Sequence, residues 1–137
     1  MTSAVLALRG AILARCQADA ALAALMGGGV RLYDEPPRAA EPVYAVFGDA
    51  AARDWSTGSD QGHAHEAAIV VWAKAGSARS ALDLAVRLEA LLHEAALPLD
   101  GHRLVTLRVA DMDVRREGGT NLARVTLRLR AVTEVIS

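Results

Sequence analysis

The sequence predicts an α+β domain in which a largely antiparallel or mixed sheet of about four to five strands packs against a long helix and an N-terminal helix. Three patterns support this fold class. Residues 67–73 form a short, uncharged, β-branched run typical of a buried strand, and residues 81–95 carry apolar side chains at the spacing of one helix face. Residues 123–131 alternate apolar and polar side chains, as a half-buried strand does. The expected order is helix, strand, strand, loop, strand, helix, strand, strand, within one domain spanning residues 1–137.

The N-terminal segment carries the signals of two helices. Ser3 is placed to cap the first helix and Asp19 the second, because both side chains accept hydrogen bonds from free backbone N–H groups. The second helix is expected to end at residues 27–29, three glycines that lack the preceding strand and the Lys-Ser/Thr pair of a phosphate-binding loop. The only cysteine continues the apolar face of the first helix and is predicted to be a core residue. That face comprises Val5, Leu8, Ile12 and Cys16.

Two strands are expected next. Residues 30–34 and 43–47 alternate like strands, and three prolines within residues 35–42 favour an extended, unpaired link between them. Gly48 and Asp49 are expected to end the second strand.

The two tryptophans lie in contrasting surroundings. Residues 50–62 have no clear period and are rich in turn formers, so we expect a long loop with Trp55 near its middle. A tryptophan in a polar loop either folds back over the core or anchors a partner. Trp72 lies inside an apolar run and is predicted to be core.

The C-terminal third predicts a turn at residues 98–101 and then two long strands joined by residues 118–121. The apolar positions of the first strand slip by one residue near Ala110 and Asp111, which indicates either a β-bulge or a break into two strands. The polar positions of the second strand are rich in arginine. A solvated or subunit-facing strand surface explains this cationic stripe, and DNA contact is the alternative. The stripe consists of Arg124, Arg128 and Arg130, with Arg108, Arg115 and Arg116 nearby on the preceding strand.

Composition describes a folded globular chain with little net charge. The 137 residues are 53% hydrophobic and 23% charged, which is enough to bury a core without disulfides or metal. The formal net charge is -1, whereas a protein that binds the phosphates of nucleic acids usually carries a strongly basic surface. The first residues do not resemble a signal peptide, and no segment reaches the roughly 20 apolar residues of a membrane span. We therefore expect a soluble protein, made in the cytoplasm, with no membrane partner.

Candidate catalytic and metal-binding residues are sparse. His63 and His65 would share one face of a strand, as metal ligands do, but no third or fourth ligand is indicated. A triad drawn from Ser56, Asp60 and His63 lacks the pattern of a nucleophile elbow. The sequence therefore predicts no cofactor, no metal and no enzymatic activity.

Four segments together resemble the phage tail-completion, or tail-terminator, family, which includes proteins of prophages and gene transfer particles. The likeness covers nearly the whole chain, and no segment of it is catalytic. The segments are the helix end at residues 24–25, the pair 30–37 and 42–48, residues 65–73 before the long helix, and residues 99–105 before the final hairpin.

The resemblance implies a structural virion protein that forms a ring, a hexamer, at the head-proximal end of the tail. There it is expected to stop tail-tube polymerisation and to form the head-tail joining surface, after assembly in the bacterial cytoplasm. Its implied partners are further copies of itself, the tail tube protein and the head-tail connector or stopper protein, while DNA passes through the ring without specific binding. The expected subunit or tube contacts are Asp34, Glu35, Pro36, Pro37, Arg38, Arg53, Asp54, Trp55, Arg115, Arg116, Arg124, Arg128 and Arg130.

Three alternatives remain at this stage. The protein could be a head-tail connector or stopper, one layer nearer the head. It could be a small metal-dependent or hydrolytic enzyme that uses His63 and His65. It could also be a ligand-binding domain of ferredoxin-like type, which would need a deep apolar pocket.

Overall fold

The computed structural model describes residues 3–35, 43–73, 78–116 and 123–136, which form three helices and a six-stranded sheet. The strand order is β1-β2-β3-β6-β5-β4, in which β1 and β2 are parallel and every other neighbouring pair is antiparallel. The predicted α+β class is confirmed. The sheet has one strand more than predicted, because part of the expected turn at residues 98–101 forms the short strand β4. The elements are α1 (Ala4–Gln17), α2 (Ala20–Leu25), β1 (Leu32–Tyr33), β2 (Tyr44–Asp54), β3 (Gly62–Trp72), α3 (Ala78–Leu92), β4 (Pro98–Leu99), β5 (His102–Arg116) and β6 (Ala123–Val135).

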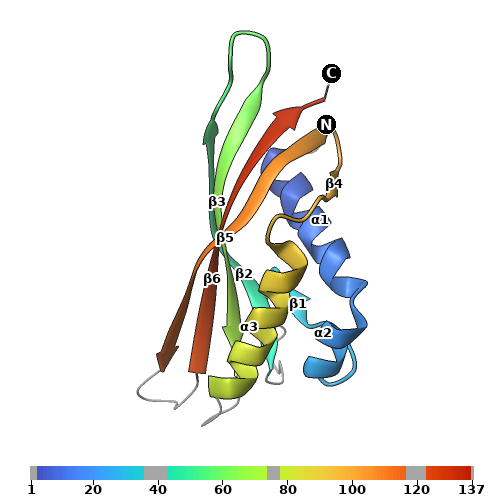
Figure 1. Cartoon of the computed structure of the whole chain (residues 1–137), viewed down its shortest axis with the longest axis vertical. Coiled ribbons are helices and arrows are strands. Elements are labelled where there is room, and N and C mark those ends of the chain that lie inside the picture. Colours follow the sequence, from blue (N-terminus) through green and yellow to red (C-terminus); the bar gives the residue numbers. More distant parts are fainter. Residues whose placement is uncertain (1–2, 36–42, 74–77, 117–122, 137) are drawn as a thin grey trace.

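The three helices cover one face of the curled sheet, and no described helix covers the other face (Figure 1). The apolar face predicted for α3 is buried against the sheet, with Leu84, Leu88 and Leu92 fully enclosed. Cys16 lies in the same core, and burial raises the pKa of its thiol to about 12. Such a thiol is unreactive at neutral pH. Within the described ranges, no helix has the length and apolarity needed to cross a membrane.

Both predicted helix caps are present. The Ser3 hydroxyl accepts a hydrogen bond from the Leu6 N–H at 3.2 Å, and the Asp19 carboxylate accepts one from the Leu22 N–H at 2.8 Å. Asp19 also receives two hydrogen bonds from Arg87 of α3, at 2.6 and 2.8 Å, and these bonds lower the pKa of its carboxyl group to about 2. The start of α2 is thereby fixed against α3.

The predicted end of α2 is also confirmed. Gly27 and Gly28 adopt positive φ angles of 89° and 112°, which side chains other than glycine's rarely tolerate. The Gly28 N–H donates to the Ala23 carbonyl oxygen at 2.8 Å and closes the last turn.

Strand β2 contradicts the prediction that Gly48 and Asp49 end it and that residues 50–62 form a long loop. The pairing of β2 with β3 shifts register between Phe47 and Ala50 and then continues to Asp54. A bulge therefore absorbs the turn-forming residues, and only residues 55–61 connect the two strands. The sequence hides this extension because small alanines at residues 50–52 give no contrast between the two faces of the strand.

Strand β5 contains the predicted bulge. Its pairing with β6 shifts between Val109 and Asp111, as the phase of its apolar residues indicates. The alternative of two separate strands is wrong, because β5 runs without interruption from His102 to Arg116. A second shift, between Leu104 and Thr106, was not predicted. The predicted connection at residues 118–121 lies outside the described residues.

Trp72 does not lie in the core as predicted. Ile69, Val71 and Ala73 alternate along β3 as fully buried residues that belong to the core cluster under the helices. Trp72 has the opposite parity and is only half-buried, on the helix-free face, where the Arg124 guanidinium lies 5.6 Å from the centre of its ring. A run that is apolar on both faces does not reveal which residues meet the helices.

Candidate functional site

His63 and His65, the candidate metal ligands, lie at the start of β3 with ring centres 6.3 Å apart. His65 is buried, and its Nε2 atom lies 2.9 Å from the Thr133 hydroxyl of β6. Burial lowers the pKa of His65, and the nearby charges of His63 and His102 lower it further. The described residues bring no group of three or more His, Cys, Asp or Glu side chains into position to hold a metal ion. His65 and Thr133 instead form a polar contact within the fold.

Ser56, the candidate nucleophile, orders the turn between β2 and β3. Its hydroxyl donates to the Asp54 carboxylate and accepts a hydrogen bond from the Gly62 N–H at 3.2 Å. Its backbone N–H also donates to Asp54 at 3.1 Å, and these two hydrogen bonds lower the pKa of the Asp54 carboxyl group. Ser56 is therefore bonded to Asp54, and the geometry predicted for catalysis with Asp60 and His63 is not assembled.

The far end of the β2–β3 hairpin projects beyond the rest of the sheet (Figure 1). We call residues 52–64 the arm. Every residue from 50 to 61 is exposed, including Trp55, whose exposed fraction is 56%. The turn is held by hydrogen bonds from the Trp55 N–H to the Gly62 carbonyl and from the Thr57 N–H to the Asp60 carbonyl, both 2.9 Å. The arm therefore presents a large aromatic side chain on a preordered tip.

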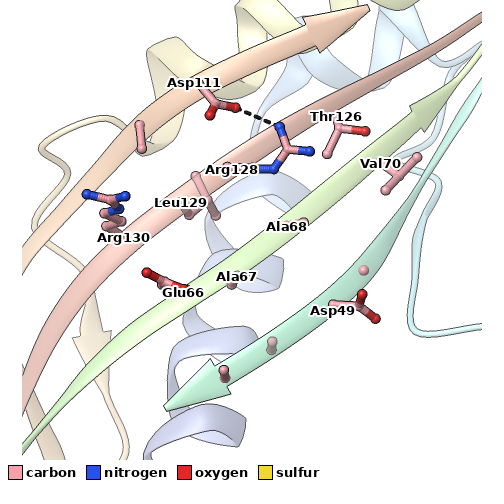
Figure 2. Close-up of a pocket in the computed structure, with 14 residues that line it drawn as sticks. Asp49, Glu66, Ala67, Ala68, Val70, Asp111, Thr126, Arg128, Leu129 and Arg130 are labelled. Carbon is pink, nitrogen blue, oxygen red and sulfur yellow. Dashed lines mark hydrogen bonds and ion pairs between the residues drawn. The ribbon is translucent and has the colours of Figure 1, made fainter. Parts of the chain in front are cut away.

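An open trough of about 550 Å³ lies on the helix-free face (Figure 2). We define the trough by its lining residues. The side formed by β2 and β3 is dominated by small residues, and the side formed by β6 and β5 carries arginine and aspartate. The lining residues are Gly48, Asp49, Ala50, Ala51, Glu66, Ala67, Ala68, Val70, Ala110, Asp111, Thr126, Arg128, Leu129 and Arg130.

Acidic residues interrupt the predicted cationic stripe. Arg128 pairs with Asp111 at 2.9 Å, as Figure 2 shows, and Arg115 pairs with Asp113 at 3.1 Å. In contrast, Arg130 lies directly opposite Arg108 and makes no ion pair with another described residue. Glu66 of β3 is the residue opposite Arg130 on its other side, so the surface beside the trough is mixed in charge.

The remaining predicted contact residues lie elsewhere. Asp34, at the end of β1, forms an ion pair with Arg9 of α1 at 3.2 Å, and Glu35 is exposed beside it. Since β1 pairs only with Ala45 and Val46, near the start of β2, these acidic residues lie at the opposite end of β2 from the arm. Arg116 lies opposite Ala123, a buried residue of the helix-covered face, and so does not join the stripe. Pro36, Pro37 and Arg38 lie outside the described residues.

Apart from Arg116, the predicted contact residues that the structure describes thus fall into three separate groups: the arm, the stripe and the end of β1. The trough, with Asp49 and Glu66, was not predicted, because two strand pairs that are distant from each other in the sequence, β2–β3 and β5–β6, form it together. The one available signal was Glu66, a charged residue next to an otherwise apolar run.

Comparisons with known proteins agree with this architecture. A family model described as "Tail completion protein gp17" matches residues 10–134. A solved chain from a structure described as "Virion of native gene transfer agent (GTA) particle" is 30% identical, with a TM-score of 0.88 over 98% of this chain and 99% of that chain. A comparison with curated protein sequences gives no significant match. Because the family model covers most of the chain and the structural likeness covers nearly all of it, the protein belongs to the family of tail completion protein gp17 and is a structural protein of a phage-type tail.

Proposed function

We propose that the protein is a tail terminator, which forms a closed ring, a hexamer by family resemblance, at the head-proximal end of the tail. There it stops polymerisation of the tail tube and provides the surface to which the head connector binds. The observation that carries this proposal is the full-length likeness to a chain of a gene transfer agent virion. Assembly takes place in the bacterial cytoplasm, and the ring then stays in the virion or virion-like particle.

The shape of the subunit supports a ring. A closed ring repeats one head-to-tail interface, so each copy needs two different surfaces that complement each other. The arm and the helix-free face are two such surfaces on one rigid fold (Figure 1). The exposed edge of β2 beyond Val46, where the pairing with β1 ends, adds a third feature that another chain can bind.

The charge distribution supports the passage of DNA without specific binding. The net charge is -1, and Arg115 and Arg128 are paired with aspartates. A protein that binds DNA tightly uses many unpaired cations to displace counterions from the phosphates. We therefore assign the arginine stripe to contacts between protein chains and not to the retention of DNA.

The deciding experiment deletes the gene in a strain that produces the particles and examines the tails by electron microscopy. A terminator predicts overlong or headless tails, which a plasmid copy of the gene restores to normal length and to attached heads. Normal, headed tails in the deletion strain would refute the proposal. Gold labelling of a tagged copy distinguishes a terminator, which touches the tube, from a stopper, which lies one layer nearer the head.

A further inference from the structure

We propose that the arm of one copy docks in the trough of the next copy, with Trp55 seated against its small residues. This inference rests on the ring-forming function proposed above, and it specifies which surfaces meet. The juxtaposition that carries it is an exposed, preordered tryptophan and an unfilled trough on the same subunit.

The arm has the properties of an interface anchor. Trp55 has an exposed fraction of 56%. Tryptophan is among the residues that contribute most to binding energy when they are buried in an interface. The hydrogen bonds of Ser56 and Thr57 already fix the turn, so docking loses little conformational freedom. Arg53, next to the tip, is exposed, and its side chain makes no ion pair or hydrogen bond with another described residue.

The trough has the properties of a receptor for such an anchor. Its β2–β3 side includes the small residues Gly48, Ala51, Ala68 and Val70, and the trough leaves a volume of about 550 Å³ unfilled. A Cβ atom at Gly48 would lie 3.3 Å from the Cβ atom of Ala68, a tight contact, so glycine keeps this part of the trough open. An indole ring buries about 150–250 Å² when it is enclosed. A volume of about 550 Å³ has room for one such ring, and a larger residue at Gly48 or Ala51 would reduce that volume.

Charges on the two rims match the arm. Asp49 and Glu66 are exposed on the β2–β3 side and form no ion pair with other described residues, so they can receive Arg53 of the neighbour. On the β6 side, Arg130 lies between Glu66 of β3 and Arg108 of β5, and its guanidinium group can stack on the face of an aromatic ring. The molecule already uses this contact elsewhere, where Arg124 lies over Trp72.

The docked arm must come from another copy. Ala51 and Arg53 pair with Glu66 and Ala64, which pair in turn with β6, and this extended ladder holds the tip away from the trough of its own chain. Contact between two different surfaces is head-to-tail, and its repetition closes a ring when the rotation between copies allows it. A segment of the tube protein in the same trough is the alternative that the experiments below distinguish.

The first experiment uses two blocking variants of the full chain and native mass spectrometry, alone and with tube protein. Trp55→Ala removes the anchor, and Ala51→Phe fills the trough at an exposed position that does not disturb the core. Each variant is expected to weaken self-association by about 30-fold, which corresponds to one interface hot spot. Val86→Ala on α3 is the matched control, because Val86 has the same exposed fraction of 56% and is expected to leave the rings intact.

Mixing the two variants tests the direction of the contact. The Ala51→Phe copy retains a functional arm, and the Trp55→Ala copy retains an open trough, so the mixture can form one junction but not the next. We expect heterodimers without rings. Rings in both single variants would overturn the inference while leaving the ring function intact, whereas an absence of wild-type rings, with or without tube protein, would overturn both.

Cross-linking supplies a measurement that does not depend on loss of assembly. Ser59→Cys in the arm and Thr126→Cys in the trough, combined in one chain, are expected to give a ladder of covalent multimers with a short bismaleimide, since the buried native Cys16 does not react. The control pair is Ser59→Cys with Val86→Cys on the helix layer. A ladder from the control pair alone, or cross-links from the trough only to tube protein, would overturn the proposal.

Discussion

Gly62, where the turn of the arm joins β3 and β3 begins to pair with β6, offers a sharp test of how the arm is anchored to the sheet. A Cβ atom at this position would lie 2.8 Å from the Thr133 carbonyl oxygen and 3.4 Å from the Trp55 carbonyl oxygen. Both neighbours are backbone atoms, so the strands themselves must separate to admit a methyl group. We expect Gly62→Ala to lower the free energy of unfolding by about 1–3 kcal/mol, the usual effect of overpacking. In a domain of this size that corresponds to a fall in melting temperature of roughly 3–12 °C.

The first assay is urea and thermal unfolding, monitored by circular dichroism. The second is amide hydrogen exchange at Val135, whose N–H donates to the Gln61 carbonyl oxygen at 2.8 Å. Exchange at Val135 should accelerate in the variant, because the strands part at that point. The matched control is Gly58→Ala at the arm tip, where a Cβ atom would meet nothing within 4 Å. An unfolding midpoint for Gly62→Ala equal to that of Gly58→Ala would show that the close approach does not constrain the fold.

Three further predictions concern the body of the subunit. Leu88→Ala, at a fully buried position of α3, should lower the free energy of unfolding by about 2–5 kcal/mol in urea titrations, while Val86→Ala on the exposed side of the same helix should change it by less than about 0.5 kcal/mol. The pKa of Asp19 falls from 3.8 to about 2 on folding, so its contribution to stability is complete above pH 4 and is lost as the pH falls toward 2; Asp19→Asn should flatten this part of the stability profile. His65 also has a lowered pKa in the folded state, so stability should decline as the pH falls below 6.5, and His65→Gln should reduce that decline in melts between pH 7 and 5.

Local sequence patterns predicted the elements whose two faces differ in polarity. The leucines of α3 and the alternation of β6 are one-sided, so the spacing of apolar residues identifies both the element and its buried face. The caps at Ser3 and Asp19 were predicted for a similar reason, since a hydrogen bond over three residues depends on local sequence alone. The phase slip in β5 likewise located one bulge, near Asp111.

Patterns without contrast between faces misled the prediction. The alanines at residues 50–52 are equally small on both sides of β2, and the apolar run of β3 gave no sign that Trp72 faces away from the helices. The extension of β2 and the position of Trp72 depend on pairing with β3 and β6, which are partners distant in the sequence.

The sequence by itself determined the α+β class, the helix-covered face of the sheet and the resemblance to tail-completion proteins, because these depend on local periodicity and on the order of segments along the chain. Only the tertiary structure decided that Trp55 stands on a projecting arm and that Gly48, Glu66 and Arg130 border one trough. The trough exists because β2, β3, β6 and β5 lie side by side in an order that differs from their order in the sequence. Its shape therefore follows from strand pairing and sheet curvature, which no single segment encodes.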